Sequence, residues 1–228
     1  LMESKTLGVA GDNVVIEENM TGLEMSTFVI SDGKNALPMA DACDYKRIFD
    51  DDRGLNTGGM GSYSPPYFYT PQLGKTVMDT VMGPVIEAMY REGVPYRGVL
   101  FGGLMITEGG PKVIEFNSRF GDPEAQVILR RLKTDLVDII MAVIEGNLDK
   151  VNVQMSEEAC VGVAMASGGY PGEYKTGLQV SGLDALDEGI EVFHAGTKLG
   201  EAGQVLTSGG RVLTVTALGK TLAEAREK

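Results

Sequence analysis

Glycine placement is the feature that most constrains how this chain can fold. Of the 31 glycines, 18 lie in four segments, residues 54–61, 98–110, 168–177 and 196–210. Glycine adopts positive φ without steric cost and lets a backbone approach a ligand closely. Short apolar runs separated by such segments are typical of strands joined by tight turns. The sequence therefore predicts a fold rich in short strands, with some glycine segments free to serve a binding site.

Apolar patterning places the regular elements. We expect strands over residues 13–17, 24–31, 36–40, 98–107 and 112–117. Thr70 before Pro71 is an N-cap followed by a proline at the first helical position, so a helix begins there and Gly93 ends it. Gly83-Pro84 should kink or break that helix. Asp122-Pro123 predicts another capped start, and an apolar stripe from Leu136 to Ile144, ended by Gly146, predicts a further helix.

The pattern of apolar runs and glycines changes along the chain, which indicates two domains. Residues 41–66 have no strong periodicity, which in a compact domain usually marks function or disorder. After about residue 155, apolar runs at 160–166, 190–194 and 211–218 alternate with glycine turns, and Thr221 opens a last helix. We predict an α+β segment over residues 1–152 and a small β-rich domain over residues 153–228. Both chain ends look cut, because the last helix stops without a C-cap.

Composition excludes several classes of function. A net charge of −12 disfavours non-specific nucleic-acid binding, which needs basic patches. The longest apolar runs are too short for a membrane span, and residues 1–5 resemble no signal peptide. Cys43 and Cys160 are too few for a disulfide framework, which favours buried thiols in a reducing, cytoplasmic compartment. With a single histidine, His194, there is no paired-histidine metal site, and a structural role is expected.

A polar face on one predicted strand is the strongest chemical signal. Strand side chains alternate, so Glu115, Asn117 and Arg119 should face one way while Ile114 and Phe116 face the other. A carboxylate, an amide oxygen and a guanidinium together could hold a hard cation beside an anionic substrate. The alternative is an amphipathic edge strand whose polar face is simply solvated.

Several motifs, in order, resemble one family. They are Asn-Thr-Gly-Gly-Met-Gly at 56–61 with Tyr-Ser-Pro at 63–65, Val-Ile-Glu-Phe-Asn at 113–117 with Arg-Phe-Gly-Asp-Pro-Glu at 119–124, Gly-Gly-Tyr-Pro-Gly at 168–172 and Phe-His-Ala-Gly-Thr at 193–197. Together they resemble the phosphoribosylamine–glycine ligase family of the ATP-grasp superfamily. The resemblance implies the C-terminal part of an ATP-grasp domain followed by a small β-rich, barrel-sandwich-like domain.

The resemblance also implies a reaction and its site. The family uses ATP to join glycine to 5-phosphoribosylamine through a glycyl phosphate, which gives glycinamide ribonucleotide in purine biosynthesis. Glu115 and Asn117 match ligands of Mg²⁺ or Mn²⁺, and no carboxylate stands at Gly102-Gly103, where the superfamily often adds one. Arg119 and Lys46 match catalytic groups, and Lys46 resembles a superfamily lysine that meets the nucleotide phosphates. The implied nucleotide contacts are Glu17, Glu18, Asn19 and Glu24, and the implied substrate contacts are Arg47, Asn56, Thr57, Gly58, Gly59 and Arg119.

Plainer interpretations stand beside these roles. Glu17, Glu18 and Glu24 could be surface charges, Arg47 half of a solvated basic pair, and residues 56–61 a flexible loop instead of a backbone cradle for phosphate. Asp122 reads better as the N-cap of the next helix than as a catalytic group. Tyr45 stands where the family commonly has histidine, so the role of that position is open.

Two other functions remain open at this point. One is an ATP-grasp ligase with a different amine acceptor, and the other is a non-catalytic module of a longer purine-biosynthesis chain. The family places an N-terminal domain and the first half of the ATP-grasp domain before this segment. We therefore expect the isolated chain to be inactive or nearly so.

Overall fold

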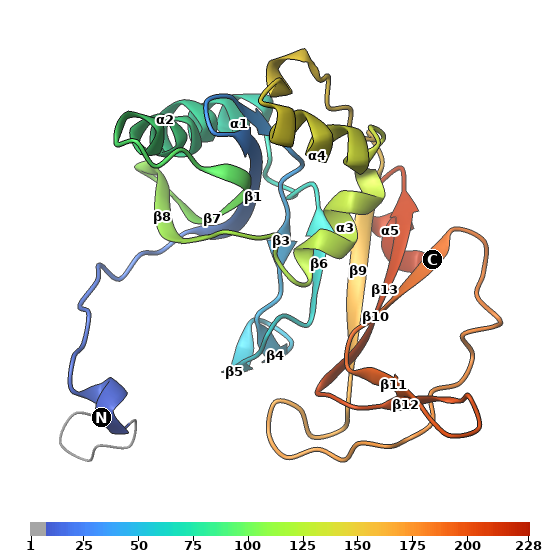
Figure 1. Cartoon of the computed structure of the whole chain (residues 1–228). Coiled ribbons are helices and arrows are strands. Elements are labelled where there is room, and N and C mark those ends of the chain that lie inside the picture. Colours follow the sequence, from blue (N-terminus) through green and yellow to red (C-terminus); the bar gives the residue numbers. More distant parts are fainter. Residues whose placement is uncertain (1–7) are drawn as a thin grey trace.

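A four-stranded sheet forms the first part of the molecule. The computed structural model describes residues 8–228, so the first seven residues of the predicted 1–152 segment lie outside the described part. The sheet has the order β2-β1-β7-β8 and antiparallel neighbours (Figure 1). Its strands are β1 (Leu23–Asp32), β2 (Ala36–Pro38), β7 (Arg97–Thr107) and β8 (Gly110–Asn117). The predicted strands at 24–31, 98–107 and 112–117 are thereby confirmed, and that at 36–40 is confirmed in shorter form.

One face of this sheet is covered by a single long helical segment. It comprises α1 (Pro71–Val77), the π-helical turn η2 (Met78–Met82) and α2 (Gly83–Arg91). Thr70 Oγ1 accepts the Leu73 amide at 3.1 Å, which confirms the predicted cap. The Gly83 amide bonds back to Met78, five residues earlier, so the break expected at Gly83-Pro84 is absorbed by the π turn. Met25 and Val29 of β1 pack against Val77, Met82 and Ile86 of these helices.

The opposite face of β1 carries the main core. Phe28 and Ile30, which alternate with Met25 and Val29, pack against α3 (Glu124–Arg131) and α4 (Leu136–Glu145). The short helix η3 (Leu148–Lys150) follows Gly146, whose φ of +71° ends α4 as predicted. Burial of both faces fixes the register of β1, since a slip of one residue would exchange the two apolar sets.

The second sheet draws strands from both halves of the chain. Its order is β10-β13-β9-β6-β3, with β10 (Ile190–His194), β13 (Arg211–Gly219), β9 (Ala159–Ala166), β6 (Gly61–Ser64) and β3 (Cys43–Asp44). Two ribbons flank it, β4 (Arg47–Phe49) with β5 (Arg53–Asn56) and β11 (Thr197–Leu199) with β12 (Val205–Thr207), and α5 (Leu222–Glu227) packs on β13 and β9. Because β6 pairs with β9, hydrogen bonds cross the predicted 152/153 boundary, which stays a prediction.

Three expectations about strands and helix caps are wrong. The strand expected over residues 13–17 does not form. Residues 12–22, which follow the short helix η1 (Gly8–Gly11), form an extended segment that projects from the rest of the molecule (Figure 1). Val15 is 85% and Ile16 93% exposed. No neighbouring strand lies beside them in the described chain to satisfy their backbone. Residues 41–66, read as irregular, contain β3 to β6, which are too short to show a period. Asp122 does not cap α3, because its carboxylate accepts from Gln126 and Arg211 instead.

The expectation for the two cysteines is confirmed. Cys43 and Cys160 are buried thiols, and burial raises the pKa of each to about 11, which keeps both protonated. His194 is exposed, with its Nδ1 2.9 Å from Thr197 Oγ1, and its structural role stays a prediction. None of the helices between residues 8 and 228 has the length and apolar character required to cross a bilayer.

Candidate functional site

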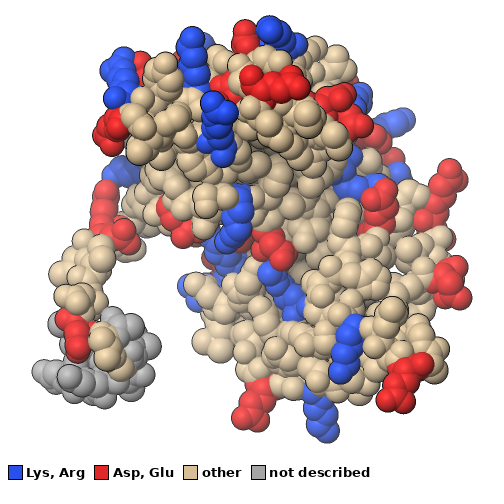
Figure 2. All heavy atoms as spheres, viewed as in Figure 1, with Lys and Arg blue, Asp and Glu red and all other residues tan. Residues whose placement is uncertain are grey.

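A cavity of about 260 Å³ lies where the two sheets approach each other. Its walls come from β1, the segment after β3, the glycine loop at 57–58, β7, β8 and the turn at 119–124. Figure 2 shows lysine and arginine side chains beside acidic ones in the hollow between the upper and lower parts of the molecule. The cavity therefore combines charges of both signs, although the chain as a whole is acidic.

The Glu115–Asn117 pair lies on β8 as predicted. Asn117 Nδ2 donates to Glu115 Oε1 at 3.0 Å, so the two side chains share one face. Glu115 lies opposite Gly103 of β7, and a register shift between Gly103 and Leu104 follows. Ile114 lines the cavity together with Glu115, so the expectation that it faces away is wrong, because a bulge interrupts the alternation.

The donor set of this pair fits a hard cation with few protein ligands. Residues 8–228 contain no group of three or more His, Cys, Asp or Glu side chains that could hold a metal ion. Glu115 and Asn117 offer a carboxylate and an amide, and rotation of that amide would turn its oxygen toward a cation. Mg²⁺ completes such a shell with water and phosphate oxygens.

Lys46 lies in a network of carboxylates. Its Nζ is 2.6 Å from Glu24 Oε2, and both side chains are about half exposed. Burial opposes the charge of Lys46, but the hydrogen bond to Glu24 and the charges of Asp44 and Glu115 outweigh it and raise its pKa. The ammonium is therefore permanently charged at neutral pH and placed to meet an anion that enters the cavity.

Two carboxylates of the cavity wall escaped the sequence reasoning. Burial and the nearby charge of Glu124 raise the pKa of Asp44 to about 6, although Lys46 opposes the shift. Glu124 is 5% exposed, and Ser26 Oγ donates to its Oε1 at 2.9 Å. Asp44 could have been found, since residues 44 and 46 of an extended segment share a face. Glu124 could not, because its closeness to Ser26 depends on how α3 docks against β1.

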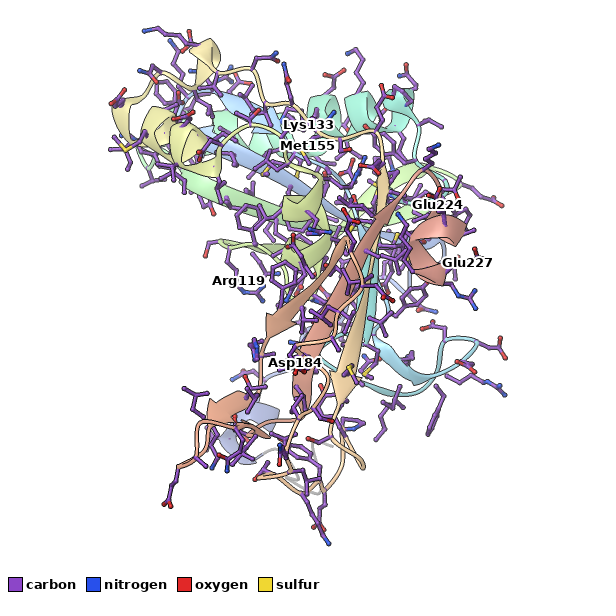
Figure 3. All side chains as sticks on the ribbon, turned by 90° about the vertical axis from the view of Figure 1, so that its right-hand side faces the viewer. Arg119, Lys133, Met155, Asp184, Glu224 and Glu227 are labelled. Carbon is purple, nitrogen blue, oxygen red and sulfur yellow. The ribbon has the colours of Figure 1, made fainter. Side chains whose placement is uncertain are left out.

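Arg119 follows β8 directly and lines the cavity. Its Nη1 donates to the Phe120 carbonyl at 2.9 Å, and the rest of its fork remains a set of donors for an anion. Figure 3 places Arg119 at mid-height, below α3, between the helix-covered sheet and the β-rich part.

The glycine loop does not form the expected phosphate cradle. Each backbone N–H from Thr57 to Met60 already has an acceptor within the protein. The Thr57 amide donates to Lys46 O at 2.7 Å and the Gly58 amide to Tyr170 Oη at 3.0 Å. The Gly59 amide donates to Thr57 Oγ1 at 3.0 Å and the Met60 amide to Tyr45 O at 2.7 Å. Thr57 and Gly58 line the cavity. Arg47 and Asn56 lie opposite each other on the exposed β4–β5 ribbon, and the Arg47 side chain donates to Gly54 O at 2.7 Å.

The predicted nucleotide contacts divide between two places. Glu24 lies at the cavity. Glu17, Glu18 and Asn19 lie on the exposed extended segment, and Lys112 of β8 donates to the two Glu18 carboxylate oxygens at 2.6 and 2.7 Å. This ion pair connects the segment to the strand that carries Glu115.

Comparison with known proteins identifies the class first. A family model described as "Phosphoribosylglycinamide synthetase, ATP-grasp (A) domain" matches residues 1–125, and one described as the "C domain" of the same enzyme matches residues 160–228. The fold is that of an ATP-grasp domain with a β-rich C-terminal part, as the resemblance implied. The chain belongs to the phosphoribosylglycinamide synthetase family.

Named relatives agree with that assignment. Phosphoribosylamine–glycine ligase of Escherichia coli (strain K12) is 49% identical over 231 residues, which cover 100% of this chain and 54% of the relative. The trifunctional purine biosynthetic protein adenosine-3 of Gallus gallus is 49% identical over 86% of this chain and 20% of its own length. The chain thus spans about half the length of the E. coli relative.

Solved structures confirm the fold. Phosphoribosylamine–glycine ligase of Thermotoga maritima superposes with a TM-score of 0.82 at 34% identity, over 93% of this chain and 52% of that protein. The biotin carboxylase domain of a thermophilic 2-oxoglutarate carboxylase has a TM-score of 0.60 at 15% identity, which shows a shared fold alone.

Proposed function

We propose that this chain carries the catalytic half-site of an ATP-dependent ligase that joins glycine to 5-phosphoribosylamine, giving glycinamide ribonucleotide, ADP and phosphate. The observation that supports it most directly is the cavity that brings Glu115 and Arg119, from β8 and the turn after it, together with Lys46, from the segment after β3. Phosphoryl transfer and acyl transfer both need fixed positive charge beside a dry, shaped site. The family membership and the names of the relatives support the specific substrates.

The proposed metal and nucleotide roles follow the geometry. Glu115 and Asn117 would hold Mg²⁺ or Mn²⁺, and the ion would supply positive charge that offsets the negative charge of the nucleotide phosphates. Lys46 would release Glu24 to meet those phosphates, which would leave the Glu24 carboxylate free to accept from the ribose hydroxyls. Glu17, Glu18 and Asn19 would contact the adenine from the extended segment. A biotin carboxylase neighbour solved with MgADP shows that this fold can hold such a nucleotide in that protein.

The proposed substrate roles concern the other wall. Arg119 would clamp the glycine carboxylate and later the acyl phosphate, because its fork matches both anions. The glycine carboxylate attacks the γ-phosphorus of ATP, ADP leaves, and the amine then displaces phosphate from the glycyl phosphate and loses a proton. Thr57 and Gly58 would close the cavity from the loop side. Arg47 and Asn56 would contact phosphoribosylamine after the β4–β5 ribbon moves toward the cavity, and Gly59 would contact it from the loop that follows β5.

Phosphate release by a chimera tests the proposal. In this chimera the chain replaces the matching segment of the E. coli relative, and ATP, glycine and phosphoribosylamine are omitted in turn. Release should require all three, and Glu115→Gln should lower it by several orders of magnitude, on the scale of removing a metal-held charge. Glu227→Gln is the matched control, since Glu227 is exposed on α5, on the side away from Arg119 (Figure 3).

Other results select the other functions. Glycine-dependent release that is indifferent to phosphoribosylamine points to a ligase with a different acceptor. A folded chimera that releases no phosphate under any condition points to a non-catalytic module. A Glu115→Gln variant with the wild-type rate removes the metal role from β8.

A further inference from the structure

Two family motifs and the start of β13 form one platform that the proposed reaction does not use. The segments at 168–172 and 193–197 both contact the turn that begins β13. The amide of Ser167, directly before the first motif, donates to Gly210 O at 2.7 Å, and the amide of Gly196 in the second motif donates to Arg211 O at 2.9 Å. A Cβ at Gly196 would lie 2.6 Å from that Arg211 oxygen, so the contact requires glycine. The platform fixes the backbone of Arg211.

From this platform, the Arg211 side chain reaches into the ATP-grasp part. Its Nη1 donates to Gly58 O at 2.7 Å and Asp122 O at 3.0 Å, with Gly59 O at 3.4 Å. Its Nη2 is 3.2 Å from Asp122 Oδ2, and the side chain is 22% exposed. One guanidinium therefore joins the glycine loop to the turn after β8.

Tyr170 holds the other side of the same loop. Its hydroxyl accepts the Gly58 amide at 3.0 Å, so the N–H and the C=O of Gly58 are both bonded to the C-terminal part. The ring of Tyr170 contacts the ring of Tyr174 edge-on. A Cβ at Gly210 would lie 2.3 Å from the Tyr170 ring. Gly210 thus makes room for the Tyr170 ring, and Gly196 makes room for the Arg211 backbone oxygen.

We infer that Arg211 is a positioning residue, which with Tyr170 sets the glycine loop as a wall of the cavity. The carbonyl oxygens of Gly58, Gly59 and Asp122 and the Asp122 carboxylate all point toward one place, and a cation there is what keeps these negative ends together. A planar fork can meet several oxygens at once, which a lysine ammonium does less well. Thr57, Gly58 and Asp122 line the cavity, so displacement of the loop opens the site. The effect on turnover rests on the proposed function; the effect on the loop does not.

Amide hydrogen exchange in this chain tests the loop directly. In Arg211→Ala, the amides of residues 57–60 should exchange on the order of tenfold faster or more, the scale of one lost charge-assisted hydrogen bond. Tyr170→Phe should affect Gly58 mainly. Arg211→Lys, which keeps the charge, should recover part of the protection and also covers the case in which the alanine variant fails to fold.

Arg130→Ala is the matched control. Arg130 lies on α3, is 12% exposed and also crosses to the C-terminal part, where it bonds Glu191 and the Gly189 carbonyl. It should lower stability without selective exchange at residues 57–60. Equal exchange rates across the chain in Arg211→Ala and Arg130→Ala would overturn the inference, because Arg211 would then be only one more structural contact.

Turnover in the chimera separates the inference from the proposed function. Arg211→Ala should lower kcat and leave the KM for ATP unchanged, while Arg130→Ala changes neither beyond the fraction folded. An inactive wild-type chimera would count against the proposed function but leave the exchange result to decide the role of Arg211. Wild-type kcat in Arg211→Ala, with a loosened loop, would overturn the claim that the loop position matters for the reaction.

Discussion

Asp32 gives the sharpest test of how the scaffold under the site is held. This residue ends β1 and is 4% exposed. Its Oδ1 accepts the amides of Lys34 and Asn35 at 3.0 and 2.7 Å, and its Oδ2 accepts Asn35 Nδ2 and the Leu148 amide at 3.0 and 3.1 Å. One carboxylate thus closes the β1–β2 turn and attaches the segment after α4 to it.

The pKa of Asp32 sets the magnitude of the effect. Burial alone would raise it, but the hydrogen bonds from Asn35, Lys34 and Leu148 outweigh burial and lower the pKa from 3.8 to about 2. Because the folded-state pKa is depressed, the stabilisation is present above pH 3.8 and is lost as the pH falls through 2. A shift of nearly two units corresponds to about 2.4 kcal/mol at pH 7 and about 1.3 kcal/mol at pH 3.

Urea unfolding of Asp32→Asn measures that contribution. The variant removes the charge and places an NH₂ group against two hydrogen-bond donors. Its free energy of unfolding at pH 7 should therefore be lower than that of wild type by about 2.4 kcal/mol or more. The difference in the free energy of unfolding between the variant and wild type should be about 1 kcal/mol smaller at pH 3 than at pH 7. Asp184→Asn is the control, because Asp184 is exposed. A gap below about 1 kcal/mol at pH 7, or one that does not change with pH, would refute the hydrogen-bond argument.

Three further predictions concern the site. Gly59→Ala should lower the free energy of unfolding by about 1–3 kcal/mol, measured by heat or urea, because Gly59 has a φ of +109° and its Cβ would lie 2.4 Å from Pro123 Cδ. An unchanged free energy of unfolding would mean that the loop moves freely. Since the pKa of Asp44 is raised to about 6, its ionisation costs stability as the pH rises from about 4 to 6, so Asp44→Asn should be more stable than wild type at pH 8 and nearly equal to it at pH 4. A deficit at pH 8 would contradict that sign. The isolated chain should release no phosphate above background with all three substrates, since half of a charged cage cannot orient them, and measurable glycine-dependent release would disprove this.

Local sequence signals were reliable wherever the determinant is itself local. Thr70-Pro71 and Gly146 bound helices as expected, because caps and positive-φ turns depend on a few adjacent residues. Long strands such as β1 and β7 were equally readable, since their alternation extends over many residues. The Glu115–Asn117 face was predictable for the same reason, and only the bulge at Ile114 escaped.

Elements that depend on a distant partner were misjudged. Val14, Val15 and Ile16 have strand-like composition, yet residues 12–22 form no strand, because a strand exists only where another backbone completes its hydrogen bonds. The reverse holds for β3 and β6, which are too short to show a period and are stable because β9 lies beside β6.

The amino-acid sequence carries the family motifs, the caps, the long strands, the shared face of Asp44 and Lys46, and the acidic and basic residues available for chemistry. Which distant groups meet depends on the tertiary structure. The fold brings Glu124 close to Asp44, uses the loop amides within the protein, and places Arg211 at Gly58, which lies 153 positions earlier in the chain. The physical reason is that pKa values, hydrogen-bond partners and cavities depend on burial and on groups far apart in the sequence, and these are set only when the two sheets pack together.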